Sequence, residues 1–114
     1  MKNILWLIKL EDRHVPYAQT WPALWNRWIM KFYYVYVLLS LKDYKFYTGF
    51  TKDLADRLKM HNNGQVVSTS YRRPFDLVYF EGCRNKDDAL HREKYLKTTY
   101  GKKYLRNRLK LDLE

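Results

Sequence analysis

The fold is decided by residues 32–50, which read FYYVYVLLSLKDYKFYTGF. A run of β-branched and aromatic residues over Phe32–Ser40 predicts a buried strand. The polar residues 41–45 predict a turn, and Phe46–Phe50 predicts a second strand. Because so short a turn separates them, we expect the two strands to form a hairpin.

The residues that follow the hairpin predict a helix, a loop and a third strand. Thr51 can cap a helix that carries Asp53 in its first turn and runs to about Asn62, with Gly64 as its stop. Residues 65–74 predict a polar loop, and Phe75–Phe80 predicts the third strand.

The last third of the chain predicts two further helices. Asn85 caps a helix over Lys86–Tyr100, Gly101 ends it, and Lys102–Leu111 forms the last helix. The order ββαβαα predicts the α+β class, with a small three-stranded antiparallel or mixed sheet and flanking helices.

Composition favours a polyanionic partner. The chain has 114 residues, with 22 Lys and Arg against 12 Asp and Glu, and a formal charge of +10. This length suits one domain. Such a charge favours nucleic acid first and an acidic membrane surface second, and the alternative is a basic surface that is only solvated.

The composition changes near residue 30. All four Trp precede this point and all four Gly follow it. We interpret residues 1–29 as an N-terminal extension, disordered or produced by a mis-assigned start with Met30 as the natural one, and residues 30–114 as the domain. The alternative is a functional appendage, in which Trp21, Trp25 and Trp28 form the apolar stripe of a helix.

Two classes of protein are excluded. Cys83 is the single cysteine, so an internal disulfide and a multi-cysteine zinc site are ruled out, and a reduced cytoplasmic setting is the simplest interpretation. No run approaches the roughly 20 apolar residues of a membrane span. We therefore expect no membrane partner.

Polar residues on apolar helix faces are the first functional signal. Arg57 and His61 share the face that Leu54 and Leu58 must bury, because these residues are three or four positions apart. On the next predicted helix, the apolar stripe is formed by Ala89, Glu93, Leu96 and Tyr100. A carboxylate on such a stripe needs a partner or a metal. An internal Arg57–Glu93 ion pair and a catalytic site both satisfy this need.

Two tripeptides that contain tyrosine, Tyr34-Val35-Tyr36 and Tyr47-Thr48-Gly49, begin an ordered set of motifs. The set continues through Arg57, His61-Asn62-Asn63-Gly64, Arg72-Arg73-Pro74, Leu77-Val78-Tyr79 and Arg92-Glu93-Lys94-Tyr95-Leu96-Lys97. These motifs, over residues 32–110, resemble those of the GIY-YIG endonuclease superfamily, in its short standalone form, similar to the nuclease domain of the excision-repair incision subunit, and the two tripeptides correspond to its name-giving motifs. The chain departs from the pattern at Tyr34, Thr48 and Phe50, which replace the usual Gly, Ile and a frequent Lys.

The resemblance implies a metal-dependent endonuclease that hydrolyses DNA phosphodiester bonds in DNA repair or recombination. Glu93 would bind one Mg²⁺ or Mn²⁺, and Tyr36 or Tyr47 would accept the proton of the attacking water. Since a free Tyr has a pKa of about 10, it needs a nearby cation near neutral pH. Arg57 and His61 would supply this positive field, and Arg57 would also clamp the phosphate. The family often has an Asn on the last helix, for which Asn107 is the nearest candidate.

Basic residues near these motifs predict the nucleic-acid contacts. Residues 92–110 contain eight Lys and Arg, and Glu93 is their single acidic residue. The predicted contacts are Lys52, Arg72, Arg73, Lys94, Lys97, Lys102 and Lys103. Phosphate contacts give affinity and no sequence choice, so we expect a protein partner that supplies specificity. RNA remains an open substrate, and the alternative function is a catalytically weak or inactive DNA-binding module that needs a partner.

Overall fold

A computed structural model describes residues 31–114, and its compact unit Phe32–Glu114 is built around one sheet. The central strand β1 (Tyr33–Ser40) pairs antiparallel with β2 (Phe46–Thr51) on one side and β3 (Phe75–Cys83) on the other. This arrangement confirms the predicted hairpin and the α+β class. The predicted extension and its Trp stripe lie outside the described residues.

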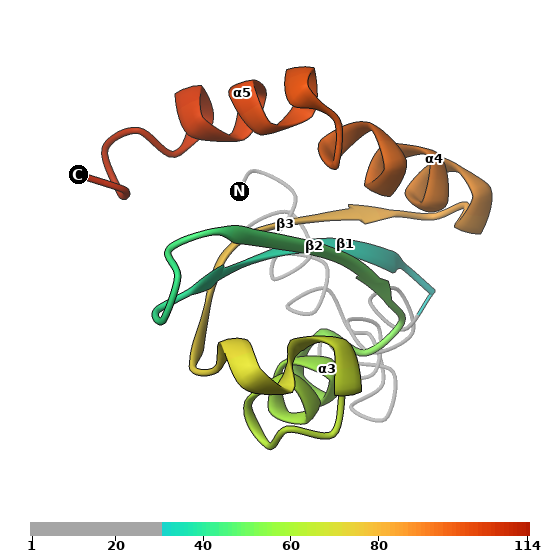
Figure 1. Cartoon of the computed structure of the whole chain (residues 1–114). Helices are drawn as coiled ribbons and strands as arrows, with labels where there is room; N and C mark the ends of the chain where they lie inside the picture. The colour runs from blue at the N-terminus through green and yellow to red at the C-terminus, as the bar shows by residue number, and fades with distance from the viewer. Residues whose placement is uncertain (1–30) are drawn as a thin grey trace, which may run out of the picture. The chain divides into compact units, whose positions relative to one another are not determined.

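Helices cover both faces of the sheet (Figure 1). The helix α3 (Leu54–Asn62) and the short 3₁₀ helix η2 (Val67–Arg72) lie on one face. The helices α4 (Lys86–Leu96) and α5 (Thr99–Arg108) lie on the other. The sheet therefore separates two packed layers, and side chains that alternate along β1 point into different layers.

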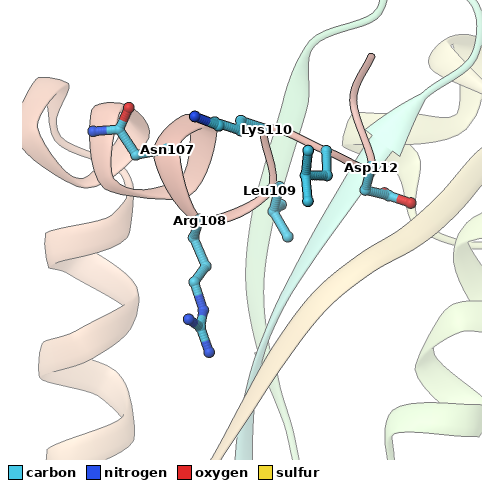
Figure 2. Close-up of a pocket in the computed structure, with 6 residues that line it drawn as sticks. Asn107, Arg108, Leu109, Lys110 and Asp112 are labelled. Carbon is cyan, nitrogen blue, oxygen red and sulfur yellow. The ribbon is translucent and has the colours of Figure 1, made fainter.

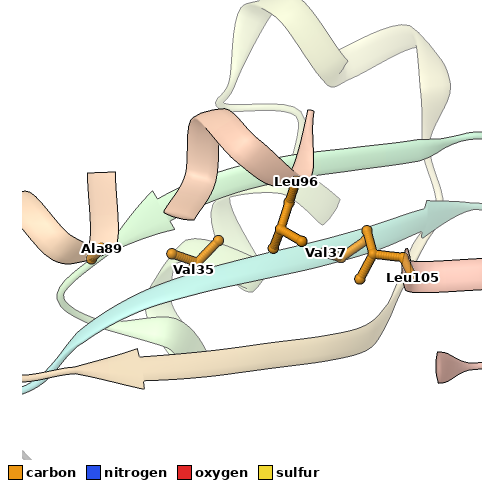
Figure 3. Close-up of a cluster of buried hydrophobic side chains, with 5 residues drawn as sticks. All are labelled: Val35, Val37, Ala89, Leu96 and Leu105. Atoms are coloured by element: carbon orange, nitrogen blue, oxygen red, sulfur yellow. The ribbon is translucent and has the colours of Figure 1, made fainter. Parts of the chain in front are cut away.

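The two layers have different cores. Val35 and Val37 of β1 are fully buried against Ala89, Leu96 and Leu105 of the α4–α5 layer (Figure 3). The core of the α3 layer consists of Tyr36, Leu38 and Phe75, with Tyr47, Leu54, Leu58 and Leu77 packed against them. A tyrosine is thus the largest buried side chain of the α3 layer.

The helix boundaries differ from the predicted ones because other residues provide the caps. Asp53, and not Thr51, caps α3 by accepting a hydrogen bond from the backbone N–H of Asp56. Thr98 caps α5 by accepting from the N–H of Gly101. Two helices therefore meet near residue 98, and the prediction that a single helix continues to residue 100 is wrong.

Gly101 lies inside α5 and does not end a helix. A Cβ at this position would collide with the backbone carbonyl of Tyr95. The glycine therefore allows the first turn of α5 to approach the last turn of α4, which is a packing role. β3 also extends to Cys83, three residues beyond the predicted end, and the predicted loop contains η2.

Candidate active site

The hydroxyl of Tyr36 lies at the centre of a polar cluster on the α3 face of the sheet. It is 2.7 Å from Nε2 of His61 and accepts a hydrogen bond from Nε of Arg57 at 3.3 Å. The ring passes directly over Gly49, its register partner on β2. A Cβ at Gly49 would collide with the hydroxyl and Cζ of Tyr36. The residue at this position of β2 must therefore lack a side chain, because the Tyr36 hydroxyl could not otherwise reach its partners.

Helix α3 positions Arg57 and His61 on the same side. Leu54 and Leu58 pack into the α3 layer, which fixes the orientation of the helix and confirms the predicted stripe. The ring centroid of Tyr47 lies 5.0 Å from that of His61 and 6.4 Å from that of Tyr36. The structure therefore brings together four of the five residues predicted to be catalytic.

His61 is neutral near pH 7. Its side chain is fully buried, and this burial, aided by the charge of Arg57, lowers the pKa of His61 to about 4. The prediction that His61 contributes positive charge is therefore wrong, since the imidazole loses its proton well below neutral pH. Arg57 supplies the positive charge of this cluster.

The hydrogen bonds around His61 assign its tautomer. Thr69 of η2 lies with Oγ1 at 2.9 Å from Nδ1 of His61 and 3.3 Å from the carbonyl oxygen of Val66. A hydroxyl has one proton to donate, and the carbonyl of Val66 can only accept it. Nδ1 of His61 then donates to Thr69, and Nε2 is left to accept the proton of Tyr36.

Tyr36 keeps its proton at neutral pH. Burial is the main cause that raises the pKa of Tyr36, and the hydrogen bond from Arg57 opposes the rise only in part. Arg57 therefore lowers the pKa of Tyr36 as expected, but burial outweighs this effect and the pKa is raised overall. The proton of Tyr36 nevertheless has an acceptor in contact, namely Nε2 of His61.

Glu93 belongs to α4, in the layer on the opposite face of the sheet from α3. Its negative charge contributes to the raised pKa of Tyr36. The ion-pair partner of Glu93 is Lys97, at 3.5 Å, while Arg57 donates to Tyr36. Among residues 31–114 there is no Arg57–Glu93 ion pair, so the structural alternative raised by the sequence is wrong.

The donor set around Glu93 suits a hard cation that retains its water. The Glu93 side chain is 18% exposed, so solvent reaches the carboxylate. Within residues 31–114 no group of three or more His, Cys, Asp or Glu side chains could enclose a metal ion. Mg²⁺ is often held by one or two carboxylates and keeps several waters, whereas structural zinc needs a closed set of ligands. A lone carboxylate therefore fits Mg²⁺ or Mn²⁺.

Besides Lys97, which pairs with Glu93, two of the predicted nucleic-acid contacts have structural partners. Arg72 forms an ion pair with Asp43 at 2.7 Å, and this guanidinium holds the pKa of the Asp43 carboxyl well below its usual range. Arg73 donates to the carbonyl of Ser70 and lies against Gly64, whose φ is +80°. Five other predicted residues are exposed: Lys52, Lys94, Lys97, Lys102 and Lys103.

Some residues that shape the site carry no signal in the sequence. Thr69 is flanked by Ser68 and Ser70, and nothing in the sequence separates it from them. Only its burial and its contact with His61 identify it. Asn107, the candidate implied by the resemblance, lines a hollow at the end of α5 together with residues 108–112, and none of the predicted catalytic residues lines that hollow (Figure 2).

The fold and the cluster define a class of small α+β domain with a tyrosine at the centre of a polar site, an arginine beside it and a carboxylate on the last helix pair. The family model described as the GIY-YIG catalytic domain matches residues 32–107. The chain therefore belongs to the GIY-YIG family, and this membership indicates a nuclease.

The chain is also similar to several UPF0213 proteins. A UPF0213 protein of Staphylococcus saprophyticus is 43% identical over 75 residues, which cover 65% of this chain and 90% of that protein. A UPF0213 protein of Clostridium perfringens is 49% identical over 65 residues, 56% of this chain and 69% of that protein. The solution NMR structure of a UPF0213 protein from Bacillus halodurans has 34% identity and a TM-score of 0.42, and the match covers 65% of this chain and 81% of that one.

The names of these relatives state no activity, so the assignment to the nucleases rests on the match to the family model. In the part of the chain from residue 31 onward, no helix has the length and apolar character needed to cross a membrane.

Proposed function

We propose that this protein is a metal-dependent endonuclease that hydrolyses DNA phosphodiester bonds in the cytoplasm, in DNA repair or recombination. The observation that carries the proposal is the hydroxyl of Tyr36, held between a permanent cation, Arg57, and a neutral imidazole, His61. Phosphodiester hydrolysis needs a group that removes a proton from water and a positive charge beside the phosphate. This cluster contains both.

Tyr36 would act as the proton acceptor through His61. As the attacking water gives a proton to the Tyr36 oxygen, Tyr36 gives its own proton to Nε2 of His61. No phenolate has to exist beforehand, so the raised pKa of Tyr36 does not prevent the reaction. A phosphate bound beside Arg57 adds negative charge near His61, which raises the pKa of the imidazole and favours the transfer.

Arg57 would bind the phosphate with its remaining donors. Its Nε donates to Tyr36, and a guanidinium has five N–H donors in a fixed plane. Glu93 would hold the Mg²⁺ or Mn²⁺, which when bound supplies charge stabilisation at the phosphate and the leaving oxygen. Tyr47 packs against His61 and fixes the plane of the imidazole.

A cleavage panel tests the proposal. The full chain is incubated with Mg²⁺ or Mn²⁺ and with single-stranded, nicked, flapped or branched DNA, with an RNA strand as a further arm. Y36F keeps the buried ring and removes the hydroxyl, and E93Q removes the charge of Glu93. Both are expected to reduce the rate at least 100-fold. The matched control D88N neutralises an exposed carboxylate at the start of α4 and is expected to cleave as the wild type does.

The outcomes separate the alternatives. Equal cleavage by the wild type and E93Q would show that the site is assigned wrongly. No cleavage by any variant, with salt-dependent binding by all of them, would establish the alternative of a binding module that needs a protein partner. Cleavage of the RNA arm alone would change the substrate class.

A further inference from the structure

The helices α4 and α5 present different chemistry on their two sides. On the side toward β3, Arg92 forms a bidentate ion pair with Glu81 at 2.9–3.0 Å. On the same side, Tyr104 of α5 lies 3.4 Å from Tyr79 of β3, hydroxyl to hydroxyl. On this side, the charge of Arg92 is therefore neutralised by Glu81 within the fold.

The side toward β2 carries cations that are exposed to solvent. Arg106 of α5 lies over the ring of Phe46, at the start of β2, with Cζ 5.2 Å from the ring centroid. Beyond the end of β2, Nζ of Lys52 lies 5.8 Å from the ring centroid of Tyr33. Each contact is a cation–π interaction that holds a positive charge beside one end of the strand.

Two more exposed cations lie on or beside these helices. Lys102 precedes Arg106 by four residues and therefore shares its side of α5. Lys97 is placed by its ion pair with Glu93, the residue that reaches toward Tyr36. We call the four exposed cations Lys52, Lys97, Lys102 and Arg106 the β2 track; Lys52 and Arg106 mark its two ends.

The β2 track has the dimensions of a polyanion site. Its six-residue strand extends over about 20 Å at roughly 3.3 Å per residue, which is long enough for several phosphates of one strand. Gly49 and the hydroxyl of Tyr36 lie near the middle of this length. The rings of Phe46 and Tyr33 pack against the α4–α5 layer and Tyr36 packs in the α3 layer, so the end charges and the cluster lie on opposite faces of β2, which is an edge strand with one unpaired side in the described sheet.

We propose that one nucleic-acid strand lies along β2, with the phosphate to be cleaved beside Gly49. Lys52 would bind phosphates on one side of the cleavage point, and Lys102 and Arg106 those on the other. The proposal rests on the proposed nuclease function and adds to it the path of the substrate. It leaves out Arg72, which is 18% exposed and pairs with Asp43 at 2.7 Å, whereas Lys97 is 55% exposed and its pair with Glu93 is longer, at 3.5 Å.

The test is the salt dependence of binding. The full chain carrying E93Q is titrated in EDTA with a fluorescent single-stranded DNA of 20 nucleotides, a length chosen to exceed the track, at several salt concentrations. The track variant adds K52Q and R106Q to this chain. The control variant adds K59Q and R108Q, which remove the same charge from exposed positions two residues along α3 and α5 from the side of the site. Figure 2 shows Arg108 at the hollow that ends α5.

The track variant is expected to lower the slope of log affinity against log salt by about 1.4, because each phosphate contact on a single strand contributes about 0.7. The control variant is expected to change it by less than half as much. Equal losses in the two variants would overturn the proposal, since the charge would then act diffusely. If the wild-type chain and E93Q cleave equally, the proposed nuclease function is overturned. The β2 track would still be tested by the salt dependence of binding, which does not require cleavage.

Discussion

The side chain of Tyr36 belongs both to the core and to the site. Its ring is 1% exposed and packs with Leu38 and Phe75, while its hydroxyl contacts Arg57 and His61. A buried hydroxyl of this kind is stabilising only while its partners remain in place. Small displacements of the ring should therefore affect chemistry before they affect folding.

The substitution G49A tests this expectation. The added methyl would collide with the end of the Tyr36 ring and push the hydroxyl away from His61. We expect cleavage to fall about 100-fold, as misplacement of a reacting group by about 1 Å can do, and stability to fall by about 1–3 kcal/mol from overpacking. Cleavage assays and thermal unfolding measure the two effects.

Gly82 provides the matched control on β3. A Cβ there would lie 3.0 Å from Phe32 and 3.4 Å from Tyr34, and would touch neither Tyr36 nor His61. G82A is therefore expected to keep most of the cleavage rate. A loss of activity in G82A as large as that in G49A would contradict the role given to the backbone at Gly49.

At the scale of elements, the site depends on a connection between the β1–β2 turn and η2. Ser40, fully buried at the end of β1, donates to the carbonyl of Arg72 at 2.6 Å and accepts from the N–H groups of Lys42 and Asp43 at 3.2 Å. The Arg72–Asp43 ion pair joins the same two segments at the surface. This connection holds η2, and with it the Thr69 hydroxyl that fixes the tautomer of His61.

The substitution S40A is expected to destabilise the protein by about 1–3 kcal/mol, because buried backbone groups lose their partner. D43N breaks a solvent-screened pair and is expected to have a smaller effect. Urea unfolding at pH 7 measures both, and amide exchange of residues 67–72 reports whether η2 has loosened. A D43N variant less stable than S40A would show that the ion pair, and not the buried serine, holds the connection.

The elements could be predicted from the sequence because their signals are local. A run of β-branched and aromatic residues identified β1, the polar turn after it marked the start of β2, and Asn85 capped α4 as expected. The short segment η2 could not be predicted, since its stability comes from Ser40 and Arg72 contacts across 32 residues of sequence. The split between α4 and α5 was predicted, but at the wrong residue, because a glycine usually ends a helix, whereas Gly101 lies inside α5 and serves close packing.

For the site, residue types could be predicted and protonation states could not. The spacing of Arg57 and His61 predicted that they share one face of α3, and in the structure both contact Tyr36, as the family resemblance implied. The pKa values depend on burial, which no spacing reveals, so the sequence assigned a charge to His61 that burial removes. Likewise, an arginine in a polar loop resembles a phosphate contact, and only the position of Asp43 shows that Arg72 is paired.

At the scale of the whole molecule, the buried His61 makes stability depend on pH. The folded pKa is about 4, and the unfolded value is about 6.5. Between these values the unfolded chain binds a proton that the folded chain does not, so the free energy of unfolding decreases as the pH falls. The stabilisation is complete above pH 6.5 and is lost toward pH 4, by up to about 3 kcal/mol.

Urea unfolding across pH 4–7 measures this slope. H61Q is expected to flatten it, whatever its effect on stability at pH 7, and the exposed His91 gives the matched control H91Q, which should keep the wild-type slope. An identical slope in H61Q and the wild type would contradict the assignment of a neutral, buried imidazole. Carboxylates that titrate in the same range contribute equally to all three curves and cancel in the comparison.

The neighbours Arg92 and Glu93 of α4 have different partners. Successive residues of a helix differ by about 100° around its axis, so Arg92 meets Glu81 on β3 while Glu93 pairs with Lys97 and acts on Tyr36 through its charge. One inserted residue between Asn85 and Arg92 would rotate both side chains together. The Arg92–Glu81 ion pair would then break, and the Glu93 carboxylate would leave its position in the site. The length of this segment is therefore under as strict a constraint as the identity of Glu93, and insertions here should be absent from functional variants of the chain.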